Sequence, residues 1–126
     1  MVLGLGTDIT EVPRIARSIE RFGGHFLERV YTPAEIAYCL ARKKSAAHSF
    51  AARFAAKEAG AKALGTGISR GIGWKELEVV RLPGQAPQLR LSGRAAARAQ
   101  HLGVARISLS LTHTAETALA VVIMEQ

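Results

Sequence analysis

The stretch FAARFAAKEAGAKALG, residues 50–65, decides the fold because it predicts a long helix with two different sides. At about 100° per residue, one side collects small residues, namely Ala52, Ala55, Ala56, Ala59 and Ala63. Small side chains let a helix backbone pack closely against a sheet or another helix. The other side carries Arg53, Lys57, Glu58 and Lys62 among Phe50, Phe54 and Leu64. We therefore predict a central helix whose charged side is more than solvent-facing surface.

The residues before this helix predict a strand followed by an amphipathic helix. Residues 2–8 are rich in apolar side chains and end in a carboxylate, Asp8. Thr10 is the predicted cap of the next helix, whose first turn tolerates Pro13, and Gly23 with Gly24 ends it. Its apolar face is predicted to hold Val12, Ile15, Ile19 and Phe22. Its opposite face gathers three cations, Arg14, Arg17 and Arg21.

A capping box, TPAE at residues 32–35, predicts a further helix that runs to about Lys44, after which Ser45 is expected to cap the central helix. A glycine-rich loop, GTGISRGIG, follows at residues 65–73. The later elements are predicted as strands at 77–82 and 88–91, a helix at 93–102 capped by Ser92, and two final strands joined by a hairpin at residues 113–117. The last strand is apolar on both faces, which predicts burial in the core or against another subunit.

Length and composition limit the fold classes, partners and locations that this protein can have. The 126 residues predict one domain, 1–126, of α+β class with an antiparallel sheet and a long central helix. The net charge of +7 indicates an anionic partner: nucleic acid, a phosphate-bearing ligand, an acidic protein or a membrane surface. A lone cysteine, Cys39, excludes a disulfide framework and a thiolate metal cluster. Neither a membrane span nor a signal peptide is predicted, so a cytoplasmic location is expected.

Two carboxylates are candidates for a metal site, Asp8 at the strand end and Glu58 on the central helix. Each also has a plain explanation: Glu58 and Lys62 are spaced as a solvated ion pair, and Asp8 suits a helix cap. The excess of cations beside apolar residues, and the glycine loop whose backbone N–H groups can approach phosphate, favour a site. If Asp8 and Glu58 meet in space, two oxygen ligands suit Mg²⁺. The pattern then indicates phosphoryl-transfer chemistry.

Four motifs carry a family resemblance: GLGTDITEVPRI at 4–15, FAARFAAKEAGAKALGTGI at 50–68, LRLSGRA at 89–95 and SLSLTHTAETALAVVI at 108–123. In this order and spacing they resemble holo-acyl-carrier-protein synthase, the small bacterial 4′-phosphopantetheinyl transferase. The resemblance implies a homotrimer with active sites at subunit interfaces. It also implies Mg²⁺-dependent transfer of phosphopantetheine from coenzyme A to a serine of acidic apo-acyl carrier protein, leaving adenosine 3′,5′-bisphosphate and supporting fatty acid biosynthesis.

The resemblance also implies roles for individual residues. Asp8 and Glu58 match the metal ligands, and we expect Glu58 to take the serine proton, with Asp8 acting through water as the rival. Lys62 is expected to stabilise phosphate charge. The positions that match the coenzyme A site are Arg53, Lys57, Lys62, Gly65 and His113. The basic helix that would meet the carrier protein carries Arg14, Arg17 and Arg21.

The histidines and the arginine-rich face each allow other interpretations. His113 follows Ile107, Leu109 and Leu111 on one strand face, so it also fits a core or interface histidine. The other three histidines are expected at the surface: His25, His48 and His101. The arginine face also fits a solvated helix or nucleic-acid binding, although no aromatic stacking platform accompanies it, and we expect no nucleic-acid or membrane partner. A trimer subunit without enzymatic activity is a further alternative.

Overall fold

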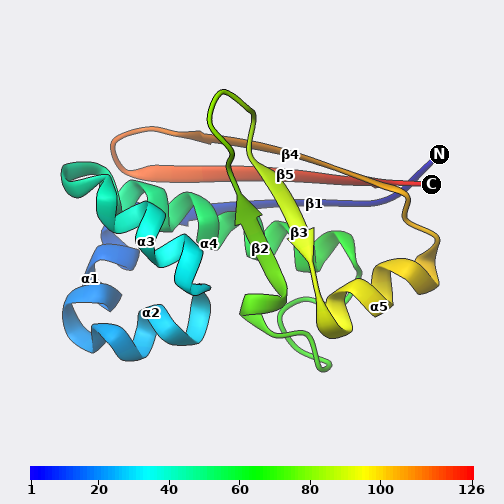
Figure 1. The fold of residues 1–126 in the computed structure, drawn as a ribbon, viewed down its shortest axis with the longest axis horizontal. Coiled ribbons are helices and arrows are strands. Elements are labelled where there is room, and N and C mark those ends of the chain that lie inside the picture. Colours follow the sequence, from blue (N-terminus) through cyan, green and yellow to red (C-terminus); the bar gives the residue numbers. More distant parts are fainter.

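A three-stranded antiparallel sheet crossed by one long helix organises the molecule (Figure 1), and the computed structural model describes residues 1–126. The strand order is β1-β5-β4, with β1 at Val2–Glu11, β5 at Thr117–Glu125 and β4 at Arg106–His113. The long helix α4, Ala46–Ala63, packs mainly on β1 and β5. A separate antiparallel hairpin pairs β2, Leu77–Val80, with β3, Gln88–Leu91.

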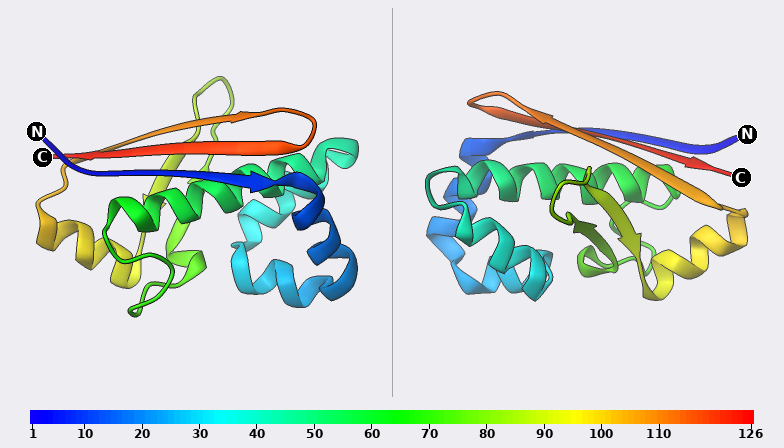
Figure 2. Two further views of the ribbon diagram at one scale, coloured as in Figure 1. Left: turned by 180° about the vertical axis from the view of Figure 1, so that it is seen from behind. Right: turned by 45° about the horizontal axis from the view of Figure 1, so that its top comes forward.

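The remaining elements lie on the same side of the large sheet as α4, as Figure 2 shows from two further directions. They are α1 (Val12–Phe22), α2 (Gly24–Val30), α3 (Pro33–Ala41), α5 (Gly93–Leu102) and two 3-10 turns, η1 (Lys43–Ser45) and η2 (Trp74–Glu76). None of the helices combines the length and hydrophobicity needed to cross a bilayer. The outer face of the large sheet is left without a covering layer.

The closest contact between sheet and helix lies where β1 crosses α4. A Cβ atom placed on Gly6 would overlap the carbonyl oxygen of Ala59, and one on Gly4 would overlap that of Ala63. Glycine on the strand and alanine on the helix therefore let the two backbones touch. Ala55, Ala56 and Ala59 are fully buried, and the predicted packing side of α4 is confirmed.

The outer face of the large sheet is apolar but open. On β5 the inner residues are fully buried beneath the helical layer, and they are Ala118, Ala120, Val122 and Met124. The alternate residues are half-buried, and they are Leu119, Val121 and Ile123. On β1, Leu5 and Ile9 pair with Ile123 and Leu119 and are 63% and 66% exposed. Within one chain, burial of the last strand is thus confirmed on one face only.

Several predicted helix boundaries are wrong, and tertiary pairing explains the first. β1 stays paired with β5 as far as Glu11, so Thr10 remains extended and Glu11 is the N-cap of α1. The Thr10 hydroxyl instead donates to Asp8 Oδ2 at 2.8 Å. The capping box at Thr32 is confirmed, but α3 ends at Ala41 because a 3-10 turn follows. Ser45 makes no capping bond, and its hydroxyl donates to the Arg42 carbonyl.

Other differences concern exposed and short elements. The sequence pattern did not predict α2, which begins at Gly24 directly after α1 ends. Phe22, expected on the apolar face of α1, is 53% exposed, and its ring lies 5.1 Å from the Arg21 guanidinium carbon. The strand predicted at 77–82 ends at Val80. The strand at 88–91, the helix at 93–102 and the final hairpin are confirmed.

Candidate active site

The crossing of β1 and α4 brings three predicted site residues together. Side chains alternate along a strand, so Asp8 shares the face of Gly6 that is turned towards α4. Lys62 on α4 donates to the Thr7 carbonyl at 3.0 Å, and its ammonium lies 3.3 Å from Asp8 Oδ1. Glu58 lies one helical turn before Lys62 on the same helix. The local fold thus gathers two carboxylates and one ammonium at the edge of the sheet.

The charges around Glu58 act on one another. Burial raises the pKa of Glu58, and the Asp8 carboxylate raises this pKa further. Lys62 and Arg14 lower the same pKa. The Asp8 carboxylate therefore acts on Glu58 across the packing of β1 on α4, although the sequence sets the two residues far apart. That both side chains meet at one cation stays a prediction.

This donor set fits a divalent cation. A cation between Asp8 and Glu58 would relieve the repulsion that raises the pKa of Glu58. Carboxylate oxygens are the ligands that Mg²⁺ and Mn²⁺ prefer. No group of three or more His, Cys, Asp or Glu side chains is placed to hold a metal ion. Water and substrate oxygens would therefore have to complete the coordination, as is usual for Mg²⁺.

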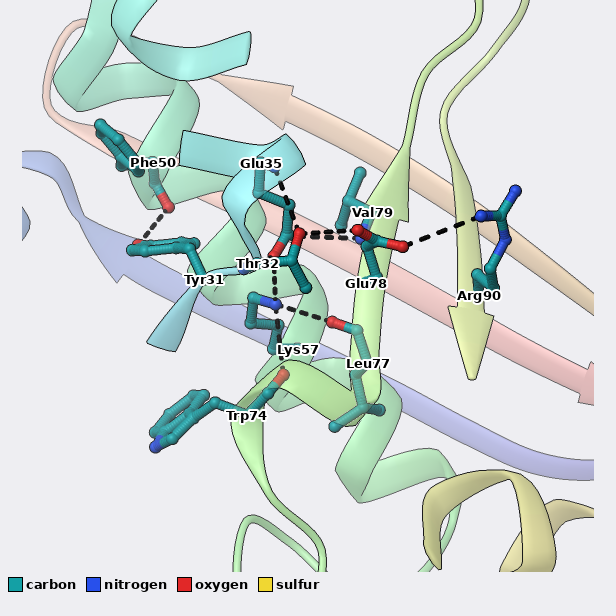
Figure 3. Close-up of polar contacts among 10 residues, drawn as sticks. All are labelled: Tyr31, Thr32, Glu35, Phe50, Lys57, Trp74, Leu77, Glu78, Val79 and Arg90. Atoms are coloured by element: carbon teal, nitrogen blue, oxygen red, sulfur yellow. Dashed lines mark hydrogen bonds and ion pairs between the residues drawn. The ribbon is translucent and has the colours of Figure 1, made fainter. Parts of the chain in front are cut away.

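Lys57 does not belong to this site, which corrects its expected role in binding coenzyme A. Its ammonium donates to Glu35 Oε1 at 2.7 Å, to the Leu77 carbonyl at 2.8 Å and to the Trp74 carbonyl at 3.2 Å (Figure 3). Both side chains of the Lys57–Glu35 pair are 0% exposed. Burial lowers the pKa of Lys57, and Glu35 counteracts this effect. All three ammonium donors are used inside the protein, so none is left for a phosphate.

The glycine-rich loop also differs from expectation at its start. Gly65 has a φ of +80°, and its N–H donates to the Lys62 carbonyl at 2.9 Å. The N–H groups of Thr66 and Gly67 both donate to the Ala61 carbonyl, at 3.2 and 3.1 Å. These donors terminate α4, as glycine commonly does in the left-handed conformation. The expectation that they close on a phosphate is therefore wrong for residues 65–67.

Arg53 and His113 lie in a second place, which we call the arginine pocket. This cavity of about 450 Å³ is lined by Arg42, Arg53, Arg81, His48 and His113, among others. Arg53 is 5% exposed, its guanidinium carbon lies 4.1 Å from the Tyr38 ring centroid, and its Nε has no hydrogen-bond partner. Three guanidinium groups around one cavity favour an anionic ligand.

His48 contradicts its expected surface position. Its ring is half-buried, and Nε2 lies 2.9 Å from the Ala115 carbonyl in the β4–β5 hairpin. The His48 and His113 ring centroids are 5.5 Å apart. His25 and His101 are exposed as predicted. His48 thus connects α4 to the hairpin that carries His113.

The two groups of site residues lie apart in a single chain. Asp8 is on β1 and His113 is on β4, at opposite edges of the large sheet. The arginine pocket includes neither Asp8 nor Glu58 nor Lys62. Winding about 100° per residue also separates Arg53 and Glu58, which share the charged half of α4, by about 140° around the helix axis. Of the residues predicted for coenzyme A, the arginine pocket therefore includes only Arg53 and His113.

The basic face of α1 borders the carboxylates. Arg14, Arg17 and Arg21 are exposed and line a shallow cavity of about 530 Å³. The Arg14 guanidinium carbon lies 5.6 Å from the Phe54 ring centroid on α4. Arg14 also lowers the pKa of Glu58, so the Arg14 end of this basic face lies nearest the predicted carboxylate site.

Comparison with known proteins decides the family. The model of the 4′-phosphopantetheinyl transferase superfamily matches residues 4–122. The chain belongs to this superfamily. Among similar proteins, the holo-[acyl-carrier-protein] synthases of Koribacter versatilis and Solibacter usitatus are 56% and 53% identical over 125 residues, 99% of this chain and 99% of each relative.

Solved structures of phosphopantetheinyl transferases agree with this fold. The holo-[acyl-carrier-protein] synthase of Neisseria meningitidis superposes with a TM-score of 0.89 at 33% identity, over 100% of both chains. The Helicobacter pylori enzyme, solved in complex with coenzyme A, has a TM-score of 0.83 at 34% identity, over 96% of this chain and 99% of that one. The predicted α+β class and the resemblance are thus confirmed.

The site of this phosphopantetheinyl transferase includes residues that sequence reasoning missed. Thr10 holds the Asp8 carboxylate, and Arg42, Arg81 and His48 line the arginine pocket. Spacing gave no signal for Arg42 and Arg81, because they reach the pocket from the turn after α3 and from beyond the end of β2. The Asp-x-Thr spacing of Asp8 and Thr10 was a usable signal, since alternate strand residues face the same way.

Proposed function

We propose that this chain transfers 4′-phosphopantetheine from coenzyme A to a serine hydroxyl of an apo-acyl carrier protein and releases adenosine 3′,5′-bisphosphate. The observation that carries the proposal is the contact of Lys62 with Asp8, one helical turn from Glu58 and beside the exposed arginines of α1. Relatives named as holo-[acyl-carrier-protein] synthases, and a similar structure that contains coenzyme A, support this substrate pair.

The residues of the site divide the chemistry between them. Asp8 and Glu58 would hold Mg²⁺, which when bound offsets negative charge on phosphate oxygens. The Lys62 ammonium, 51% exposed, is free to turn from Asp8 towards a phosphate oxygen of the substrate. Glu58 receives the serine proton in this proposal, because burial raises the pKa of Glu58 and makes it a better proton acceptor than an ordinary glutamate. Asp8, acting through a water, is the alternative acceptor.

We include a homotrimer in the proposal, with each site shared by two chains. The arginine pocket includes none of the carboxylates, and the proposal brings the two groups to one ligand by pairing the carboxylates of one copy with the arginine pocket of another. Coenzyme A carries a pyrophosphate and a separate ribose phosphate. The pyrophosphate suits the carboxylate group with its cation, and the ribose phosphate suits the arginine pocket. The open apolar face around Leu5 and Ile9 supplies a surface for assembly.

The partner protein in this proposal is an acidic carrier protein that docks on Arg14, Arg17 and Arg21. These arginines border the carboxylates, so a protein bound there would place its serine near Glu58. Attraction between opposite charges would speed association and weaken with salt. A cytoplasmic location and a role in fatty acid biosynthesis belong to the same proposal.

Mass spectrometry tests the reaction directly. Apo-acyl carrier protein is incubated with the chain, coenzyme A and Mg²⁺, and a parallel sample contains EDTA. We expect a mass increase equal to one phosphopantetheine group in the first sample alone. An unmodified carrier protein in the presence of Mg²⁺ would contradict the proposed reaction, and an increase that survives EDTA would contradict its dependence on the metal.

Mixing two defective variants tests the shared site. Asp8→Asn disables the carboxylate group, and Arg53→Gln disables the arginine pocket. Chains of both kinds are mixed under conditions that allow subunits to exchange. If each site uses two chains, some mixed sites are intact and activity rises above that of either variant. A mixture no more active than its components would contradict the shared site.

A further inference from the structure

The end of α4 lacks backbone donors for a phosphate. The N–H groups of residues 65–67 are bound to carbonyls of α4 itself. The C-terminal end of a helix also carries partial negative charge from its carbonyl groups. An anion placed beside Gly65 would therefore need a cationic side chain in addition to Lys62.

Arg98 of α5 supplies that cation. Its Nε donates to the Leu64 carbonyl at 3.0 Å, which fixes one edge of the guanidinium group. Its Nη2 lies 3.6 Å from the position that a Cβ atom on Gly65 would occupy. The side chain is half-buried, and the bond from Nε to Leu64 is the one hydrogen bond that the Arg98 side chain makes within the protein. The terminal nitrogens are thus held beside Gly65, and their N–H groups are free to bind a ligand.

We propose that Arg98 is a coenzyme A-binding residue whose terminal guanidinium nitrogens bind a phosphate oxygen of coenzyme A beside Gly65. The proposal rests on the function proposed above. Gly65 follows Lys62 by less than one helical turn, so Arg98 extends the positive charge of Lys62 along the loop. A guanidinium group held at one edge matches a phosphate well, because its planar fork is already oriented.

A purely structural role for Arg98 makes a different prediction. A cation bound to the Leu64 carbonyl stabilises the end of α4 whether or not coenzyme A binds. Loss of that role alone would lower the melting temperature and leave the affinity for coenzyme A unchanged. The affinity of the folded protein therefore separates the two roles.

The experiment compares Arg98→Gln with Arg94→Gln in the full chain. Arg94 lies one turn earlier on α5, beside Gly71, so this control removes the same charge from the same helix. Isothermal titration with coenzyme A measures the dissociation constant of each folded variant. We expect Arg98→Gln to weaken binding about tenfold, as for one charge-assisted hydrogen bond. We expect Arg94→Gln to bind as the wild type does. In steady state, Arg98→Gln should raise KM for coenzyme A and leave KM for the carrier protein unchanged.

Wild-type affinity in Arg98→Gln, or equal weakening in both variants, would overturn the proposal. If Arg98→Gln does not fold, Arg98→Lys takes its place, because lysine keeps the charge but lacks the planar fork that binds Leu64 at one edge and presents two further nitrogens to a phosphate. A few-fold weakening supports the proposal, and unchanged affinity overturns it. Absence of transfer by the wild-type chain would instead refute the proposed function, so the two failures are distinguishable.

Discussion

Two lysine–carboxylate pairs on the same helix have opposite surroundings. Lys57 and Glu35 lie 2.7 Å apart with both side chains fully buried. Lys62 and Asp8 lie 3.3 Å apart, with the lysine 51% and the aspartate 16% exposed. Little more than one helical turn separates the two lysines. The sequence presents the two lysines alike, and burial divides the pairs into one closed to water and one open to it.

The difference in burial decides whether the members of each pair can be released to bind other partners. Lys57 and Glu35 connect α3, α4 and β2, since Glu35 also accepts from the N–H of Val79 at 2.9 Å. Giving up one partner would leave a charge without water. The Lys62–Asp8 pair is wet and contributes little to stability. A pair held so weakly can release its partners to a metal ion and a phosphate.

The largest expected effect is on turnover and concerns the open carboxylates. Asp8→Asn or Glu58→Gln should each lower kcat/KM about a thousandfold, since each removes a ligand or a base needed in the transition state. The free energy of unfolding should fall by less than about 1 kcal/mol, because neutralising either residue relieves repulsion. Steady-state kinetics and urea unfolding measure the two quantities. The matched control is Glu28→Gln, which neutralises an exposed carboxylate on α2. Wild-type turnover in either site variant would remove that carboxylate from the mechanism.

The second effect concerns stability and compares the lysines directly. Lys57→Met should lower the free energy of unfolding by about 3–5 kcal/mol, because Glu35 is left buried without its cation. Lys62→Met should lower it by less than about 1 kcal/mol. Urea unfolding measures both. A double variant, Lys57→Met with Glu35→Leu, should recover part of the loss, because no buried charge remains. Equal losses for the two single variants would mean that burial does not separate the pairs.

The third effect concerns the arginines of α1, which lie beside the exposed Lys62–Asp8 pair. Reversing charge with Arg21→Glu should raise KM for the carrier protein about tenfold at low salt, with coenzyme A affinity nearly unchanged. Arg14→Glu should do the same and should also alter the pH dependence of kcat, because Arg14 lowers the pKa of Glu58. Kinetics at two salt concentrations check these outcomes. Equal losses of coenzyme A and carrier-protein binding would argue against a docking role.

The smallest effect concerns the buried region around Lys57 and Glu35, and it uses Cys39 of α3 as a probe. Burial raises the pKa of Cys39 from 9.0 to about 11. Between these values the folded protein binds more protons than the unfolded chain, so stability should fall as pH rises from about 9 to 11. Cys39→Ala should flatten this slope. A thiol reagent at neutral pH should label Cys39 only after unfolding, and rapid labelling of native protein would show that this region is open.

Local patterns predicted the parts of the fold that local forces determine. The alanine side of α4, the capping box at Thr32 and the final hairpin all follow from spacing and turn chemistry. The convergence of Asp8 and Glu58 was a conditional hypothesis and stays a prediction, which the packing of β1 on α4 and the effect of Asp8 on the pKa of Glu58 support.

The rest depended on contacts that spacing does not encode. Glu35 was assigned to helix capping, yet the same carboxylate also binds Lys57 and the N–H of Val79. A helical wheel placed Lys57 with Glu58, but it could not show that α3 and β2 cover Lys57 and leave Glu58 partly exposed. Likewise, the composition of the glycine loop did not reveal that α4 itself uses the first N–H groups of the loop.

Gly4 and Gly6 have a consequence for catalysis that reaches beyond packing. Because these two residues lack side chains, β1 lies directly on the carbonyls of Ala59 and Ala63. The distance between β1 and α4, and with it the separation of Asp8 and Glu58, therefore depends on the absence of a Cβ atom at Gly4 and Gly6. Alanine at either position would push the strand away from the helix and widen the gap that a cation bound in the proposed way would span, so it should lower activity without changing any proposed site residue.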